Sequence, residues 1–264
     1  MRIPFQQVDA FADSPFAGNP AAVMPLEAWL DDNILQAIAA ENNLAETAFI
    51  VPWAGEEADY ELRWFTPMVE VVLCGHATLA TGHVLLSRNA TIDTVRFMTR
   101  RAGLLEVARN GAGYKLALPA WRLAPQALPD LVAAVGGSPT ETHWRDGGYA
   151  LLRYQSAAEI LALAPDFRAM RQLGDILFIA TAPGNATDIV SRVFAPGAGI
   201  DEDPVTGSAH CLLATYWAEK LGRNSFTAYQ ASERGGYLDC ELDGERVILN
   251  GKCVTVIEGA FTLS

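Results

Sequence analysis

Several features that would define a function are scarce or missing in this sequence. Cysteine occurs four times in 264 residues, and the spacing Cys-x-x-Cys is absent. This pattern excludes a disulfide-rich secreted scaffold and predicts reduced thiols. No run of about 18 apolar residues occurs, because the most apolar stretch, 69–86, is interrupted by one glutamate and two histidines. Residues 1–7 contain no apolar signal-peptide core, so we expect a cytoplasmic location.

Basic residues are also few. The sequence has 19 Lys and Arg residues against 31 Asp and Glu residues, which gives a formal net charge of −12. Because a surface with this much negative charge repels phosphate backbones and anionic lipids, we expect neither nucleic acid nor a membrane as a partner. A small anionic substrate stays possible, because a binding site can be locally positive. Half of the residues are apolar and 19% are charged, enough for a sizeable core.

Motifs that are typical of cofactor binding or metal binding are missing as well. No Gly-x-Gly-x-x-Gly follows an expected strand, and no lysine lies in an apolar run of the kind that suggests pyridoxal phosphate. Gly-x-Ser-x-Gly is absent, which argues against a serine hydrolase. His-Glu-x-x-His and similar ligand spacings are absent too. We therefore expect no cofactor and no metal.

What is present is an internal repeat of about half the chain. Short matches follow one another in the same order at a nearly constant offset: 65–67 with 194–196, 75–77 with 207–209, 103–105 with 236–238, and 110–111 with 243–244. Each match is weak alone, but their order indicates two copies of one structural plan. The Pro- and Gly-containing stretch 119–139 marks the expected boundary.

Each copy contains a helix that is apolar on nearly every side, over 76–86 and 208–221, so each helix must be buried. Segments with period-2 alternation follow: 95–99, 104–109 and 114–118 in the first copy, and 226–230, 237–242, 246–249 and 252–257 in the second. Hairpin turns are predicted at 110–111, 243–244 and 250–251. An amphipathic helix is expected over 30–41.

Strands that curl around one buried helix hide that helix most simply. The sequence therefore predicts an α+β fold with two pseudo-symmetric lobes, each a mostly antiparallel, barrel-like sheet around a central helix. We assign 1–118 to the first lobe and 119–264 to the second, and we allow for terminal strands that cross between the lobes.

The starts of the two buried helices are candidate binding elements. The first amides of a helix have no intrahelical partner, and a glycine lets a ligand approach the backbone. Gly75 and Gly207 open the two helices, so their amides are candidates for holding a carboxylate in a cleft between the lobes. Ordinary capping by Ser208 and a tight turn at Gly75 explain the same residues equally well.

Four polar residues are candidates for chemistry. Glu46 begins the apolar strand 47–51, where it is either a general acid/base or an exposed residue at a strand end. Asp203 lies close before Ser208 and could hold a proton there, or merely favour the helix dipole. His76 is a candidate proton carrier or a structural histidine. Asp175, opposite Glu46 in the repeat, is a second candidate base or a surface residue.

The chain resembles a known family along nearly its whole length. The matching segments are Val8-Asp9-Ala10-Phe11, Gly18-Asn19-Pro20, Asn43-Leu44-Ala45-Glu46-Thr47-Ala48-Phe49, Phe65-Thr66-Pro67, Glu70-Val71, Cys74-Gly75-His76-Ala77-Thr78 and Asp203-Pro204-Val205-Thr206-Gly207-Ser208-Ala209. They are similar to those of the PhzF-like phenazine biosynthesis family. The resemblance implies a fold like that of diaminopimelate epimerase and a homodimer.

The resemblance also implies roles for the candidate residues. Glu46 would be the acid/base, while His76, Asp203 and Ser208 line the same pocket. The amides at Gly75 and Gly207 would hold the substrate carboxylate. The activity implied is a cofactor-independent isomerisation that moves a proton on a small cyclic or unsaturated carboxylate, similar to that of the dihydro-hydroxyanthranilate isomerase of phenazine biosynthesis.

Two other functions remain open. The first is an epimerase or racemase of an amino acid that uses Cys74 as one of two thiols. The matching place in the second copy is Thr206, with Cys211 about one turn inside the helix, so the second thiol is missing. The other is a non-catalytic protein that binds small carboxylates.

Overall fold

A computed structural model of the chain describes residues 1–263. The chain divides into two compact units. The first comprises Met1–Leu118 and the chain from Ile248 onward, and the second comprises Pro119–Val247. The sequence predicted that the residues after 247 belong to the second lobe, apart from an exchange of terminal strands between the lobes. β17 (Arg246–Gly251) runs across this boundary.

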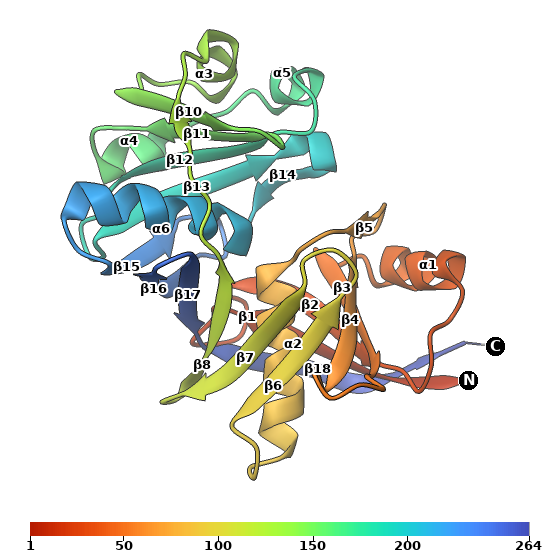
Figure 1. Ribbon diagram of the computed structural model, residues 1–264. Helices are drawn as coiled ribbons and strands as arrows, with labels where there is room; N and C mark the ends of the chain where they lie inside the picture. Colours follow the sequence, from red (N-terminus) through yellow and green to blue (C-terminus); the bar gives the residue numbers. More distant parts are fainter. Residues whose placement is uncertain (264) are drawn as a thin grey trace. The chain divides into compact units, whose positions relative to one another are not determined.

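The first unit is a curved sheet that surrounds one helix (Figure 1). Its elements are β1 (Arg2–Ala10), β2 (Asn19–Pro25), α1 (Asp32–Asn42), β3 (Glu46–Pro52), β4 (Tyr60–Phe65), β5 (Glu70–Val71), α2 (Gly75–Arg88), β6 (Thr94–Thr99), β7 (Leu104–Asn110), β8 (Gly113–Pro119) and β18 (Cys253–Thr262). Neighbouring strands follow the order β18, β1, β2, β3, β4, β6, β7, β8. Only the β2–β3 and β4–β6 pairs among these are parallel.

Helix α2 is the core of this unit. It contacts strands β1, β2, β3, β6, β7 and β18, and ten of its 14 residues are buried. Small side chains make this close packing possible. A Cβ atom on Gly82 would lie 2.6 Å from the Val107 Cβ on β7. Helix α2 is therefore apolar on every face because strands enclose it, as the sequence predicted.

The second unit repeats the arrangement. Its elements are β9 (Ala124–Pro125), α3 (Pro129–Val135), β10 (Glu141–Arg145), β11 (Tyr149–Arg153), α4 (Ala157–Ala162), α5 (Phe167–Gln172), β12 (Leu177–Pro183), β13 (Ile189–Ala195), the 3-10 helix η1 (Pro196–Ala198), β14 (Ile200–Asp203), α6 (Gly207–Leu221), β15 (Ser225–Gln230) and β16 (Gly236–Asp243). Eleven of the 15 residues of α6 are buried. The indole of Trp217 on α6 donates a hydrogen bond to the Thr181 hydroxyl of β12 at 3.0 Å.

Strand pairing in the two units follows one plan. The parallel pair β2–β3 corresponds to β11–β12, and the antiparallel pair β3–β4 corresponds to β12–β13. The parallel pair β4–β6 corresponds to β13–β15, and β6–β7 corresponds to β15–β16. This agreement confirms the duplicated, mostly antiparallel α+β architecture.

One predicted turn was wrong. Asn250 and Gly251 lie inside β17, and after Lys252 the chain enters β18. β18 pairs antiparallel with β1, from Arg2 opposite Thr262 to Ala10 opposite Cys253. An Asn-Gly pair is a local hairpin signal, whereas the partner of β18 lies at the far end of the sequence.

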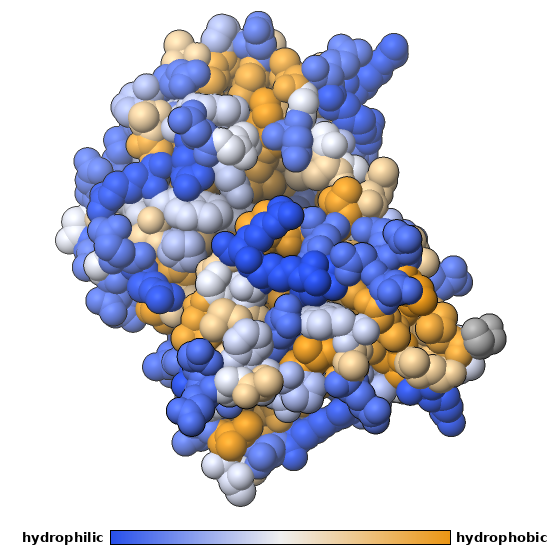
Figure 2. All heavy atoms as spheres, turned by 45° about the vertical axis from the view of Figure 1, so that its right-hand side comes forward, coloured by the Kyte–Doolittle hydropathy of each residue, from blue (hydrophilic) through white to orange (hydrophobic). Residues whose placement is uncertain are grey.

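The polarity of the surface and the lengths of the helices agree with the amino-acid composition. On the face in Figure 2, hydrophilic side chains are interspersed with smaller hydrophobic areas. Within residues 1–263, no helix is both long enough and apolar enough to cross a membrane. All four cysteines are free.

Candidate active site

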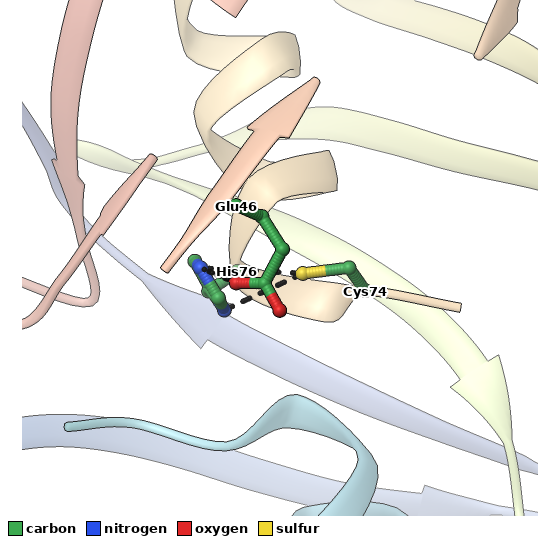
Figure 3. Close-up of side chains that lie close together, drawn as sticks. All are labelled: Glu46, Cys74 and His76. Atoms are coloured by element: carbon green, nitrogen blue, oxygen red, sulfur yellow. Dashed lines mark hydrogen bonds and ion pairs between the residues drawn. The ribbon is translucent and has the colours of Figure 1, made fainter. Parts of the chain in front are cut away.

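Two elements of the first unit bring the candidate acid/base together with a histidine. Glu46 is the first residue of β3, which pairs in parallel with β2. Cys74 is the N-cap of α2, and His76 is the second residue of that helix. The three side chains point toward one another (Figure 3). The strand and the helix that the sequence predicted thus place Glu46 and His76 side by side.

The Glu46 carboxylate and the His76 imidazole form a close ion pair. The distance from Glu46 Oε2 to His76 Nε2 is 2.9 Å, and the two side chains are 13% and 4% exposed. Oε2 is buried, and His76 Nε2 lies next to it. A carboxylate held in place beside an imidazole is suited to proton transfer.

The other nitrogen of His76 has two polar neighbours. Nδ1 lies 3.2 Å from the side-chain amide of Asn19 on β2 and 3.5 Å from Cys74 Sγ. Asn19 is fully buried. These contacts fix the plane of the imidazole ring, so Nε2 stays directed at Glu46.

The pKa values in this cluster follow from burial and neighbouring charge. Burial alone would lower the pKa of His76, but interactions with Cys74 and Glu46 outweigh it and raise that pKa well above its ordinary value. Burial and the Glu46 carboxylate raise the pKa of Cys74 to about 11. The Cys74 thiol therefore keeps its proton near neutral pH, and the carboxylate next to His76 is that of Glu46, at 2.9 Å.

In the second unit, a side-chain network holds the loop before α6. The Thr206 hydroxyl donates a hydrogen bond to the Asp203 carboxylate. The Gln230 amide donates to the Asp203 carbonyl at 2.7 Å and accepts from the Thr206 amide at 2.9 Å. Gln230 is fully buried on β15. This network fixes the loop between Asp203, the last residue of β14, and Gly207, the first residue of α6.

Ser208 has an aromatic neighbour that the sequence analysis did not identify. The Ser208 side chain lies near the Tyr149 hydroxyl of β11, and burial raises the pKa of Tyr149. The Tyr149 ring lies edge-on to Trp121, with 5.3 Å between the ring centroids. The Arg145 guanidinium lies 4.5 Å from the Trp121 ring centroid. Ser208 thus stands next to an aromatic and cationic group.

Both central helices begin at the predicted glycines, without a side-chain cap. α2 begins at Gly75 and α6 begins at Gly207; neither N-cap residue makes a side-chain capping bond, and neither first turn contains an acidic residue. The first amides of both helices therefore keep their capacity to bind an anion.

The structure separates the predicted site residues into two groups. In the first unit, Glu46 and His76 are in contact, next to Gly75. In the second unit, Asp203 ends β14, and Gly207 and Ser208 begin α6 after a short loop. Asp175 lies in an exposed bend before β12.

Sequence reasoning missed Asn19, Gln230 and Tyr149 as site residues. Only Asn19 had a signal, since it occurs in one of the segments that carried the family resemblance. Gln230 and Tyr149 lie in strands far from the motifs in sequence, and only the sheet brings them to the start of α6.

Comparison with known proteins settles the family. A family model described as phenazine biosynthesis-like protein matches residues 8–259. The chain belongs to the phenazine biosynthesis-like family. An uncharacterised isomerase of Pseudomonas aeruginosa is 48% identical over 264 residues, which cover all of both chains. The protein is accordingly an isomerase.

Solved structures agree with this family and its fold. A PhzF-family protein of Enterococcus faecalis has 41% sequence identity and a TM-score of 0.90, with both chains fully covered. A hydroxyproline epimerase of Agrobacterium vitis has 13% identity and a TM-score of 0.62, over 98% of this chain and 92% of its own. That second likeness shows the fold alone, and it confirms that the epimerase-like architecture is shared beyond the family.

Proposed function

We propose that this phenazine biosynthesis-like isomerase moves a proton by acid/base catalysis on a small cyclic or unsaturated carboxylate, with Glu46 as the acid/base and without a cofactor. The supporting observation is the buried Glu46–His76 pair, in which Oε2 lies 2.9 Å from Nε2. A carboxylate that is held against an imidazole in this way can act as a general acid/base.

The reaction begins when Glu46 removes a C–H proton next to an unsaturated or carbonyl system. The negative charge spreads through the conjugated system of the substrate, and the Glu46 carboxylic acid returns the proton at another carbon. His76, held as an imidazolium, loses its anionic partner when Glu46 takes up the proton. It then stabilises the negative charge of the substrate, as preorganised positive groups do.

The substrate carboxylate needs donors of its own. From the family resemblance, we propose as donors the first amides of the central helix of each unit, at Gly75 in α2 and at Gly207 in α6, and the Ser208 hydroxyl. Asp203 would orient polar substituents of the substrate and help to move the proton. The uncapped helix starts support this assignment. We further infer a homodimer and a cytoplasmic location, both from the family.

The test replaces Glu46 by Gln. Cyclic and aromatic carboxylates, including dihydro-hydroxyanthranilate, are incubated with the protein in D₂O, and deuterium incorporation is followed by NMR. We expect Glu46→Gln to lower the exchange rate at least about 100-fold, the usual contribution of a general acid/base. Carboxylate binding, measured by calorimetry, stays within a few-fold of wild type. Exchange at the wild-type rate would overturn the assignment.

A second candidate function uses Cys74 in the epimerisation of an amino acid. The observation that favours it is the 3.5 Å distance from Cys74 Sγ to His76 Nδ1. A partner thiol is lacking at α6, because Thr206 is the N-cap and the buried Cys211 thiol donates to the Gly207 carbonyl. Burial also raises the pKa of Cys211 to about 12.

Deuterium exchange separates the two candidates. Exchange at the α-carbon of an amino acid that disappears in Cys74→Ser would establish the epimerase. Exchange into cyclic carboxylates that survives in Cys74→Ser and disappears in Glu46→Gln supports the proposed isomerase. Carboxylate binding without exchange into any compound would indicate a non-catalytic binding protein.

A further inference from the structure

The cluster in Figure 3 brings together three chemically different metal-ligating atoms. One sulfur, one imidazole nitrogen and one carboxylate oxygen, from Cys74, His76 and Glu46, lie within 4.8 Å of one another. The sulfur is 3.5 Å from Nδ1 and 4.0 Å from Nε2, and Nε2 is 2.9 Å from the carboxylate oxygen. Ligands around a tetrahedral zinc ion, at bond lengths of about 2.0–2.3 Å, are roughly 3.4 Å apart. The distance between Nε2 and the carboxylate oxygen is shorter than this value, and the two distances from the sulfur to the ring nitrogens are longer.

The donor set selects the kind of ion. Mg²⁺ and Ca²⁺ take oxygen ligands, whereas a thiolate with an imidazole suits Zn²⁺ and its softer analogue Cd²⁺. A bound thiolate and a carboxylate together carry two negative charges, which neutralise a divalent cation. That balance matters here because Cys74 is 6% exposed and His76 is 3% exposed. Three protein ligands leave a fourth position for water or a substrate oxygen.

The spacing of the three residues in the sequence does not predict this site. Cys74 and His76 are two residues apart at the start of α2, and Glu46 lies on a different strand. On the side of β2, the Asn19 amide nitrogen lies 3.2 Å from His76 Nδ1 and limits the rotation of the imidazole ring. The site is therefore assembled by the fold of the first unit alone.

We propose that Glu46, Cys74 and His76 form a reversible binding site for a zinc-class divalent cation, and that occupancy inhibits the isomerase. Binding follows from the three converging donor atoms. Inhibition rests on the proposed function, because a cation on the Glu46 oxygen prevents that oxygen from accepting a substrate proton. The same cation also takes a ring nitrogen of His76, which removes the imidazolium charge.

The binding test uses the full chain, reduced and stripped with a chelator. Cd²⁺ is titrated while the sulfur-to-cadmium charge-transfer band in the ultraviolet is recorded, and Zn²⁺ binding is measured by calorimetry. We expect one ion per chain for both metals and no saturable binding of Mg²⁺. Cys74→Ser should remove the charge-transfer band and weaken Zn²⁺ binding at least about tenfold. Glu46→Gln, which removes a different ligand, should also weaken Zn²⁺ binding.

The matched control is Cys253→Ser, which changes a cysteine of the same unit that lies outside the cluster. It should bind both metals as the wild type does. The inference is overturned if the wild type shows no saturable binding, or if Cys74→Ser and Glu46→Gln both keep wild-type affinity. Circular dichroism of each variant shows that the chain is folded.

Inhibition is measured separately by adding Zn²⁺ to the deuterium-exchange assay. We expect exchange to stop at one equivalent of bound metal and to return when a chelator is added. Metal binding without inhibition would refute the inhibitory half of the inference. If no carboxylate shows exchange, the proposed function fails while the binding titration still decides the metal site. If metal does not bind, the proposed function is untouched.

Discussion

At the residue scale, the site depends on side chains that hold other side chains. Asn19 contacts the imidazole nitrogen that faces away from Glu46, and Gln230 fixes the loop between Asp203 and Thr206. Both are fully buried amides whose hydrogen bonds serve their neighbours. Buried polar groups of this kind are costly unless they are paired, so their hydrogen bonds strongly determine the local geometry.

Asn19→Leu tests this positioning role. The variant loses the polar contact to His76 Nδ1, so the ring is held less firmly against Glu46. We expect the rate of proton exchange to fall about tenfold, the scale at which outer partners act. We also expect a shift in the pH dependence of the rate. Asn19→Gln should recover part of the loss; an unchanged rate and pH profile for Asn19→Leu would contradict the role.

His210 provides a pH prediction. It is fully buried on α6, its Nδ1 donates to the Thr206 carbonyl at 2.8 Å, and burial lowers its pKa to about 4. An unfolded histidine has a pKa of about 6.5, so between these values the unfolded chain binds a proton that the folded chain does not. The free energy of unfolding therefore falls as the pH decreases through this window.

The size of this effect is measurable. From pH 7 to pH 5 we expect His210 to reduce the free energy of unfolding by about 2 kcal/mol. Urea denaturation at both pH values should show that reduction in the wild type and a correspondingly smaller one in His210→Gln. Equal reductions in the two proteins would contradict a neutral, buried His210.

At the element scale, the strands that enclose the two central helices determine which side chains fit on those helices. Gly82 on α2 shows how close the packing is, because an added Cβ would meet Val107 Cγ1 at 2.3 Å. Alanine is intrinsically about 1 kcal/mol better than glycine inside a helix. Packing against β7 must therefore outweigh helix propensity at this position.

Gly82→Ala makes this conflict measurable. We expect the variant to lower the free energy of unfolding by about 1–3 kcal/mol, the usual cost of overpacking. Adding Val107→Ala should recover part of that loss in denaturant titrations, since it removes the nearest methyl group. A Gly82→Ala chain that is more stable than wild type would show that α2 is not held so tightly.

Much of each element could be predicted from the sequence. Helices apolar on every face, alternating strands and the turns at 110–111 and 243–244 are local patterns, and the structure has them. The pairing of β18 with β1 could not be predicted, because nothing local in 253–262 specifies a partner at the other end of the chain. The contact between Glu46 and His76 likewise needed the family resemblance, since a strand and a helix start have no fixed spacing in sequence.

At the scale of the whole molecule, two features determine the architecture. The chain is a duplication of one plan, and its C-terminal strand β18 belongs to the first unit. Both units use the same strand pairings around a central helix, and the last strand returns to the first unit. β18 also contacts α2 through side chains: His83 Nε2 lies 2.9 Å from the Thr255 hydroxyl, and Arg88 pairs with Glu258 at 2.7 Å. The enclosure of α2 therefore depends on residues from both ends of the sequence.

Removal of residues 253–264 tests this dependence. We expect the first unit to lose cooperative folding, because β1 loses one of its two neighbouring strands and α2 loses its contacts with β18. Limited proteolysis should cut within 1–118 far faster than in the full chain. Removal of residues 263–264 alone is the control and should have little effect. A truncated chain whose first unit resists protease like the full chain would contradict this account.

The central claim is that Glu46 moves a proton of a carboxylate substrate, and deuterium exchange tests it most directly. Wild-type protein, Glu46→Gln and Cys253→Ser are each incubated with the carboxylate panel in D₂O, and incorporation is followed by NMR. We predict exchange into at least one carboxylate by wild type and Cys253→Ser, and a rate at least about 100-fold lower in Glu46→Gln with binding preserved. Exchange by Glu46→Gln at the wild-type rate would contradict the claim.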